Sequence, residues 1–259
     1  TCRMIKQKIK RYILGLCKAS HEASKLSRTL SNSQRKKIIS SIIIKLSNQK
    51  EYIFKRNSID VKNAIKSKMS DALIDRLLIN DQRISSMIDG LKKIKSIPDT
   101  LFKKINKTIQ PSGICVEQMR VPIGVIGMIY ESRPNVTIDA AGLSIKSGNS
   151  IILRGGSESI NSNLALSSII KKSLRECEMP INMVQLINTT DRSAVSELLK
   201  QEEYVDLIIP RGGKNLIKKI SNESKIPVIK HLDGNCHVYI DSEAVSYTHL
   251  RAHETSRYL

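Results

Sequence analysis

Apolar residues recur at helical spacing through roughly the first hundred residues of the chain. Between residues 18 and 101 they lie three or four positions apart, which is the period of an amphipathic helix. Ser70 and Asn80 precede two of these stretches and are residue types that cap helix N-termini. Pro98 ends the last stretch, because proline lacks the amide donor that a helix interior needs. The clearest apolar positions are Ile38, Ile39, Ile42, Ile43, Leu46 and Ile53.

The pattern changes after residue 114, where short apolar runs alternate with amphipathic helical stretches. Near-continuous apolar strands separated by helices indicate a parallel sheet that is covered on both faces. The sequence therefore predicts an α/β fold, with a Rossmann-like open parallel sheet preceded by an N-terminal helical region. The strand-like runs are 124–130, 150–156, 183–188, 205–213, 226–234 and 236–241, and the helical stretches are 138–148, 163–177, 192–201 and 215–224.

Two glycine-rich turns follow strands of this expected sheet, at the edge where ligands bind in such folds. Glycine permits close backbone approach, and the helix that follows offers unpaired N–H groups to an anion. Arg154 and Arg211 add positive charge that suits phosphate, including the 2′-phosphate of NADP. Each turn alone could be an ordinary turn, but two at equivalent strand ends indicate a dinucleotide site. The candidate cofactor residues are Arg154, Gly155, Gly156, Ser157, Glu158, Arg211, Gly212 and Gly213.

Positive charge is concentrated in the first part of the chain. The formal net charge is +19. Residues 1–110 carry 26 Lys+Arg against 8 Asp+Glu, and residues 111–259 carry 17 against 16. A basic half could bind nucleic acid, which gives an alternative function for residues 1–110. Lysines spread over solvated helix faces explain the same charge, and aromatic residues, at 3%, offer few platforms for base stacking.

The cysteines and the apolar runs bear on the compartment. The five cysteines form no CxxC pair, so we expect a reduced, cytoplasmic protein rather than a disulfide framework. No apolar run reaches the roughly 18 residues that a membrane span requires. We therefore expect no membrane partner.

Several segments resemble a known family. "VPIGVIGMIYESRPNVTIDAAGLSIKSGNSIILRGGSE", "VDLIIPRGG" and "HLDGNCHVYID" resemble the gamma-glutamyl phosphate reductases, an offshoot of the aldehyde dehydrogenase superfamily. The resemblance covers Ala19 to Ala244. It implies that residues 1–110 are the helical part of a cofactor-binding domain and that residues 111–244 are its Rossmann-like NADP-binding part. A homo-oligomer of the full-length enzyme is compatible with it.

The resemblance also implies a reaction, in which a cysteine thiolate attacks gamma-glutamyl phosphate and NADPH reduces the thioester to glutamate 5-semialdehyde, a step of proline biosynthesis. Arg133 and Asn135 of "YESRPN" are the implied substrate-binding residues, and we favour this role over the alternatives of a solvated loop cation and a helix cap. His231 stands where related dehydrogenases carry a general-base glutamate. It could shuttle a proton, contact phosphate or be structural.

The family's nucleophilic cysteine lies beyond the "HVYID" segment, in a separate catalytic domain. The match stops near Ala244, and we interpret residues 245–259 as a foreign tail. We therefore expect no catalytic residue, a missing catalytic domain and an inactive fragment. Cys236 precedes a buried-strand pattern and is better explained as a structural cysteine than as the nucleophile. We expect no metal site, since His249 and His253 have no third ligand.

Overall fold

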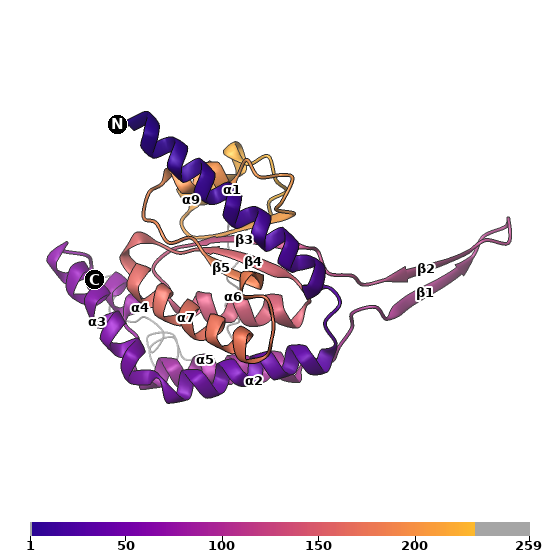
Figure 1. Cartoon of the computed structure of the whole chain (residues 1–259), viewed down its shortest axis with the longest axis horizontal. Coiled ribbons are helices and arrows are strands. Elements are labelled where there is room, and N and C mark those ends of the chain that lie inside the picture. The colour runs from indigo at the N-terminus through magenta and orange to yellow at the C-terminus, as the bar shows by residue number, and fades with distance from the viewer. Residues whose placement is uncertain (1, 231–259) are drawn as a thin grey trace, which may run out of the picture.

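The computed structural model describes residues 2–230, with side chains from residue 7 onward. His231, Cys236 and the segment 245–259 lie outside these residues. Within them, helices surround a four-stranded parallel sheet, and a two-stranded hairpin projects to one side (Figure 1). The helices are α1 (Cys2–Ser27), α2 (Asn32–Asn48), α3 (Lys50–Lys66), α4 (Asp71–Leu77), α5 (Asp81–Ser96), α6 (Asn135–Lys146), α7 (Ile160–Glu176), α8 (Ser193–Leu198) and α9 (Lys214–Glu223). The strands are β1 (Lys104–Ile109), β2 (Cys115–Met119), β3 (Val125–Tyr130), β4 (Ser150–Arg154), β5 (Val184–Leu186) and β6 (Leu207–Arg211).

The predicted N-terminal helical region is confirmed, and its caps are where the sequence placed them. Ser70 is the N-cap residue of α4, and the Asn80 side chain accepts a hydrogen bond from the Arg83 amide at the start of α5. Helix α5 ends at Ser96, two residues before Pro98. The first helix begins earlier than expected, since α1 runs from Cys2 rather than from about residue 18.

The main sheet has the strand order β5–β4–β3–β6, and all four strands are parallel. The chain proceeds from β3 through β4 to β5 on one side, and then returns to place β6 on the other side of β3. The strand order therefore reverses between β3 and β6, which is where open α/β sheets bind ligands. Gly155 follows β4 and Gly213 follows β6, so both glycine turns lie at the same edge, as predicted.

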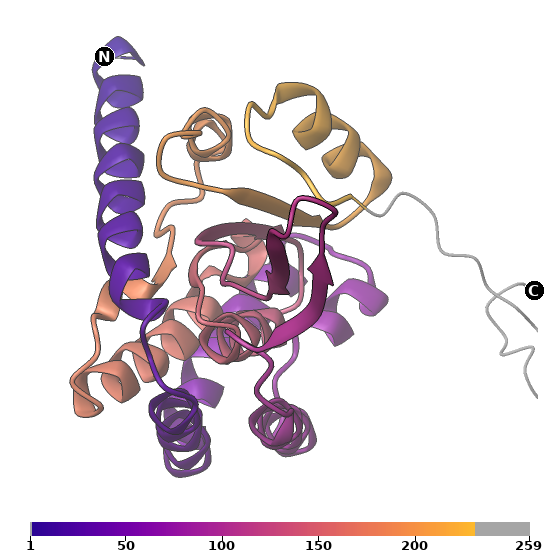
Figure 2. The same ribbon diagram turned by 90° about the vertical axis from the view of Figure 1, so that its right-hand side faces the viewer.

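Helices cover both faces of this sheet because side chains along each strand alternate between the faces. Ile126 and Tyr130 of β3 face one core, which they share with α2, α5, α6 and α7. Val125 and Ile129 face the other core, which they share with α1, α8 and α9. Figure 2 shows α8 and α9 on one side of the sheet and the helices α2 and α5 on the far side. The N-terminal helical segment is thus divided, with α1 on one face and the rest on the other.

The β1–β2 hairpin was not predicted. Its strands pair antiparallel, and every residue in them is exposed. The predicted boundary at residue 110 lies between these two strands. Of the predicted strand at 226–234, the described part shows a single parallel bridge between Val228 and Ile208.

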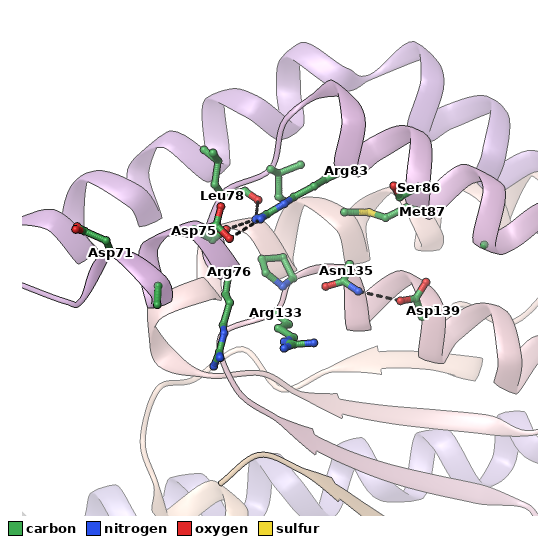
Figure 3. Close-up of a pocket in the computed structure, with 14 residues that line it drawn as sticks. Asp71, Asp75, Arg76, Leu78, Arg83, Ser86, Met87, Arg133, Asn135 and Asp139 are labelled. Carbon is green, nitrogen blue, oxygen red and sulfur yellow. Dashed lines mark hydrogen bonds and ion pairs between the residues drawn. The ribbon is translucent and has the colours of Figure 1, made fainter. Parts of the chain in front are cut away.

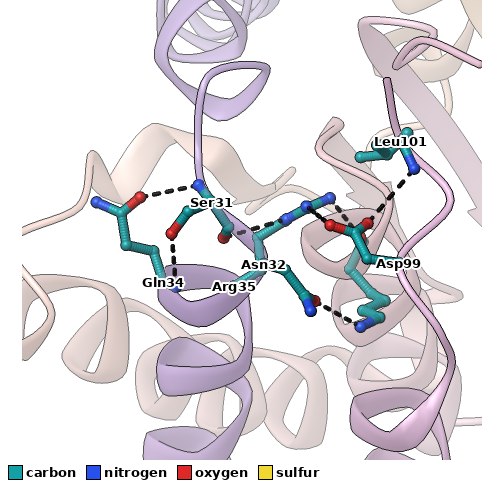
Figure 4. A network of polar contacts seen from close by, with 7 residues as sticks. Ser31, Asn32, Gln34, Arg35, Asp99 and Leu101 are labelled. Carbon is teal, nitrogen blue, oxygen red and sulfur yellow. Dashed lines mark hydrogen bonds and ion pairs between the residues drawn. The ribbon is translucent and has the colours of Figure 1, made fainter. Parts of the chain in front are cut away.

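A buried arginine joins three segments of the helical layer (Figure 4). Arg35 of α2 is 2% exposed and donates to the Asp99 carboxylate at 2.7 Å. Its guanidinium also donates to the carbonyl oxygens of Lys146 at 3.0 Å and Ser31 at 3.3 Å. The hydrogen bond to Lys146 satisfies a carbonyl at the C-terminus of α6 that has no partner within its own helix. Arg35 therefore fixes α2 against the end of α6 and against the segment that leads to the hairpin.

Candidate functional site

The loop after β3 connects the two glycine turns. The Glu131 carboxylate accepts a hydrogen bond from the Gly213 amide at 2.9 Å. The Glu158 carboxylate accepts from the Ser132 amide at 2.6 Å and from the Ser132 hydroxyl at 2.7 Å. The loop after β3 thus contacts both predicted glycine turns. Glu131 and Ser132 were not predicted as site residues, although they lie in the quoted "YESRPN".

The glycines of the two turns are glycines for different reasons. A Cβ on Gly155 would lie 2.1 Å from the Asn163 amide nitrogen and 3.1 Å from the Tyr130 ring, so packing explains Gly155. A Cβ on Gly156 or Gly212 would meet the carboxylate of Glu158 or Glu131. At Gly213 a Cβ would meet no atom within 4 Å, and the φ of −65° suits any residue. Neither packing nor backbone conformation therefore requires glycine at position 213.

A buried chain of polar groups supports the β4 turn from below. The Tyr130 and Thr137 hydroxyl groups lie 2.6 Å apart, and Thr137 donates to the Asn163 carbonyl at 3.0 Å. Asn163 in turn donates to the Ser159 hydroxyl at 2.9 Å. Burial raises the pKa of Tyr130 well above its ordinary value, so this phenol stays protonated. The chain holds the start of α7 in a fixed position next to the turn.

A cavity of about 360 Å³ lies beside this edge, between α8 and α9. Its walls combine apolar side chains of the two helices with three cationic side chains. Arg154 donates to the carbonyl oxygens of Gly155 at 2.7 Å and Thr190 at 3.3 Å, and burial lowers the pKa of its guanidinium. The cations are Arg154, Arg192 and Lys219, and the apolar residues include Val195, Leu199, Leu216 and Ile220.

Arg192 and Lys219 were missed by the sequence analysis. Arg192 follows β5 in the polar segment "NTTDR", and its position after a strand was the available signal. Lys219 lies within α9, where the sequence offered no signal that distinguishes it from a solvated lysine. It reaches the site only because α9 packs against the sheet.

A larger cavity of about 1020 Å³ lies on the other side of the strand edge, between the helices α4 and α5 and the start of α6 (Figure 3). It contains Arg133 and Asn135, the two substrate-binding candidates. Asn135 donates to the Asp139 carboxylate at 3.0 Å, and burial raises the pKa of Asp139. Arg211 lines an adjoining groove together with Arg133, Asn135 and Asp139.

The predicted site residues are thus divided by the strand edge. Arg154 to Glu158 lie on the side of the smaller cavity, whereas Arg133, Asn135 and Arg211 lie on the other side. This arrangement can hold an extended ligand that crosses the edge between β3 and β6. His231, the third substrate-binding candidate, lies outside the described residues.

The parallel sheet and the two glycine turns at one edge are features of a dinucleotide-binding α/β protein, and comparison with known families agrees with this class. The aldehyde dehydrogenase family matches residues 6–248, and the chain belongs to that family. A gamma-glutamyl phosphate reductase of Psychrobacter cryohalolentis is 47% identical over 233 residues, which are 90% of this chain and 54% of that protein. The resemblance inferred from the sequence is therefore confirmed.

Two solved structures of gamma-glutamyl phosphate reductases have the same fold. The Thermotoga maritima structure is 40% identical with a TM-score of 0.81, over 83% of this chain and 52% of that chain. The Saccharomyces cerevisiae structure is 34% identical with a TM-score of 0.78, over 85% of this chain and 56% of that chain. The chain spans about half of the length of the relatives that it matches.

Proposed function

We propose that this chain forms the cofactor-binding part of a gamma-glutamyl phosphate reductase. Such an enzyme reduces L-glutamate 5-phosphate to L-glutamate 5-semialdehyde with NADPH and releases phosphate, in proline biosynthesis. One observation carries the proposal: two glycine turns and an arginine-lined cavity meet where the strand order reverses. The relatives named above support the choice of reaction. They give no support to the nucleic-acid alternative for residues 1–110.

The residues around the smaller cavity fit NADP. Val195, Leu199 and Leu216 offer apolar surface to an adenine ring, and Arg154 and Arg192 supply charge for a 2′-phosphate. The Gly213 amide at the N-terminus of α9 already donates a hydrogen bond to an anionic group, the Glu131 carboxylate. A phosphate oxygen can accept a hydrogen bond from the same amide, and the absence of a side chain at Gly213 leaves room for the phosphate. When bound, the nicotinamide supplies the hydride.

Arg133 and Asn135 are the proposed contacts to the reacting end of the substrate. Both lie at the end of β3, next to the turn that Glu131 and Gly213 form. The Arg133 guanidinium suits an acyl phosphate, and the Asn135 amide can donate to a carbonyl oxygen that gains negative charge. His231 stays a proposed substrate contact on the basis of the resemblance.

We also propose that the full-length protein is a cytoplasmic homo-oligomer. The β1–β2 hairpin exposes apolar side chains on both strands, among them Ile109 at 69% and Val116 at 46% exposure. A surface of this kind indicates an interface, because exposed apolar patches are otherwise uncommon on proteins in solution. Cys17, Cys115 and Cys177 are free thiols, which suits a reducing compartment. No helix among residues 2–230 has the length and hydropathy that a bilayer span needs.

The proposal is tested first by binding and then by activity. The 259-residue chain should bind NADPH in a fluorescence titration, and duplex DNA at moderate salt should not compete. Joined after Ala244 to the remaining length of the Psychrobacter relative, the chain should reduce NADP with glutamate 5-semialdehyde in the presence of phosphate. Binding of DNA without NADPH would replace this proposal with the nucleic-acid alternative.

A further inference from the structure

Helix α4 forms one wall of the larger cavity, and a buried asparagine fixes its position. The Asn57 side chain donates to the Leu77 carbonyl at 2.9 Å and accepts from the Ile79 amide at 2.8 Å. It also donates to the Ser162 hydroxyl at 2.9 Å, which ties this contact to α7. Asn57 is 2% exposed. The segment between α4 and α5 is therefore held to the body of the protein, and side chains of α4 keep a defined place over the cavity.

Three arginines line this cavity, and only one of them has its guanidinium occupied by the protein. Arg83 donates to the Leu78 carbonyl at 2.6 Å, to the Asp75 carboxylate at 3.0 Å and to the Asp75 carbonyl. The guanidinium groups of Arg76 and Arg133 form no hydrogen bond or ion pair with any residue of the described part of the chain. Figure 3 shows the side chains of Arg76 and Arg133 extending into the same space, toward the strand edge.

The carboxylates of the cavity do not compensate these two charges. Asp75 is paired with Arg83, and among the described residues neither Asp71 nor Asp139 forms an ion pair with Arg76 or Arg133. Figure 3 shows Asp71 at the far end of α4, directed away from Arg133. Two unpaired guanidinium groups that converge on one cavity repel each other unless an anion lies between them. The cavity is therefore suited to a ligand with two anionic groups.

The proposed substrate has two anionic groups, an acyl phosphate and an α-carboxylate, which the glutamyl carbon chain separates. The reacting end must lie near the strand edge, because the cofactor residues are there, and Arg133 is the arginine at that edge. Arg76 reaches the same space from α4, which forms the opposite wall. We infer that Arg76 of α4 binds the α-carboxylate of the substrate and so selects a glutamyl chain over simple acyl phosphates or aldehydes. This inference rests on the proposed function.

Two amides of glutamate separate the roles of the arginines. L-Glutamine retains the α-carboxylate but lacks the side-chain carboxylate, and L-isoglutamine has the reverse pattern. Each is titrated into the 259-residue chain while the side-chain Nε–H signals of Arg76 and Arg133 are followed by NMR. Arg76→Gln should weaken the binding of L-glutamine by at least about tenfold, because a charged hydrogen bond is lost. It should weaken the binding of L-isoglutamine by less than about twofold. Arg133→Gln should show the opposite preference.

Control variants separate a loss of contact from a loss of charge or of fold. Lys93→Gln on the exposed surface of α5 removes one positive charge away from the cavity and should leave both affinities unchanged. Arg76→Lys should retain part of the L-glutamine affinity, because the charge remains but the paired donors of the guanidinium are lost. NADPH affinity, measured on each variant, reports whether the cofactor side of the protein is intact.

Equal effects of Arg76→Gln on the two amides would overturn the inference. An absence of any shift of the Arg76 signal with L-glutamine would overturn it as well. Either result with normal NADPH binding leaves the proposed function standing. If the wild-type chain binds L-glutamine through Arg76 but does not bind NADPH, the proposed function fails and the carboxylate site remains.

Discussion

At the residue scale, Arg154 and Arg192 differ in how much of each guanidinium is available to a ligand. Two nitrogens of Arg154 donate to backbone carbonyl oxygens, whereas the Arg192 guanidinium has no hydrogen bond or ion pair within the described residues. We expect Arg192→Ala and Arg154→Ala each to weaken the binding of NADPH more than the binding of NADH. The expected cost for NADPH is about 1.5–3 kcal/mol, the value of a hydrogen bond to a charged group. Calorimetric titrations with both cofactors measure this, and equal weakening would show that neither arginine contacts the 2′-phosphate.

Asp139 predicts a dependence of stability on pH. Burial is the largest cause of its raised pKa, so the folded protein holds this proton more tightly than the unfolded chain does. The stability of the wild type should therefore fall as the pH rises from the ordinary aspartate range through the raised pKa. Asp139→Asn removes the ionisable group. The free energy of unfolding of the variant, relative to the wild type, should therefore increase with pH from the ordinary aspartate range to the raised pKa. Urea unfolding at several pH values measures the difference, and a difference that is constant with pH contradicts the assignment.

At the scale of elements, the N-terminus of α7 is capped by a residue of another helix. Asp60 of α3 is 2% exposed and accepts from the Asn161 amide at 3.2 Å and the Ser162 amide at 2.7 Å. Its carboxylate also accepts from the side chains of Asn161 at 2.8 Å and Ser162 at 2.6 Å. These contacts satisfy amides that a helix start leaves without partners.

Asp60→Ala should lower the free energy of unfolding by about 2–3 kcal/mol, because buried donors lose their acceptor. Asp89→Ala on the exposed face of α5 is the matched control, since its ion pair with Lys92 is exposed on both sides. That control should change stability by less than about 1 kcal/mol. Urea denaturation compares the two variants. A loss in Asp60→Ala no larger than in the control means that the α3–α7 contact does not stabilise the fold.

Elements with a regular apolar pattern could be predicted from the sequence, and elements without one could not. Helix α2 buries residues at helical spacing and strand β4 buries four consecutive residues, so both patterns can be recognised in the sequence alone. The β1–β2 hairpin buries nothing, so its sequence has no such pattern.

The residues of the candidate site also differ in whether the sequence alone could identify them. Gly155 and Gly213 could be placed at the sheet edge because they lie within two residues of a strand end. Arg76, Arg192 and Lys219 lie on helices or in a polar loop, and only the packing of those segments brings them to a cavity.

At the scale of the whole molecule, the hairpin is the surface on which we expect assembly. Ile109 and Val116 are exposed, so Ile109→Lys with Val116→Lys should leave the free energy of unfolding nearly unchanged. If a second copy covers the hairpin, the double variant should dissociate at concentrations where the wild type is associated, because buried apolar surface is replaced by charge. Sedimentation velocity over a range of concentrations measures this. Equal association of the wild type and the double variant would exclude the hairpin as the interface.

The central claim is that the edge between β3 and β6 binds the phosphates of NADPH, and Gly213 offers the most direct test of it. A side chain at this position meets no protein atom, so Gly213→Val should fold as the wild type does, as should the control Gly15→Val in α1. We predict that the wild type and Gly15→Val bind NADPH and that Gly213→Val binds it at least about tenfold more weakly, because the valine side chain occupies the place of the phosphate. The measurement is a fluorescence titration of the three folded proteins with NADPH. Equal affinity in all three, or no binding by the wild type, would contradict the claim.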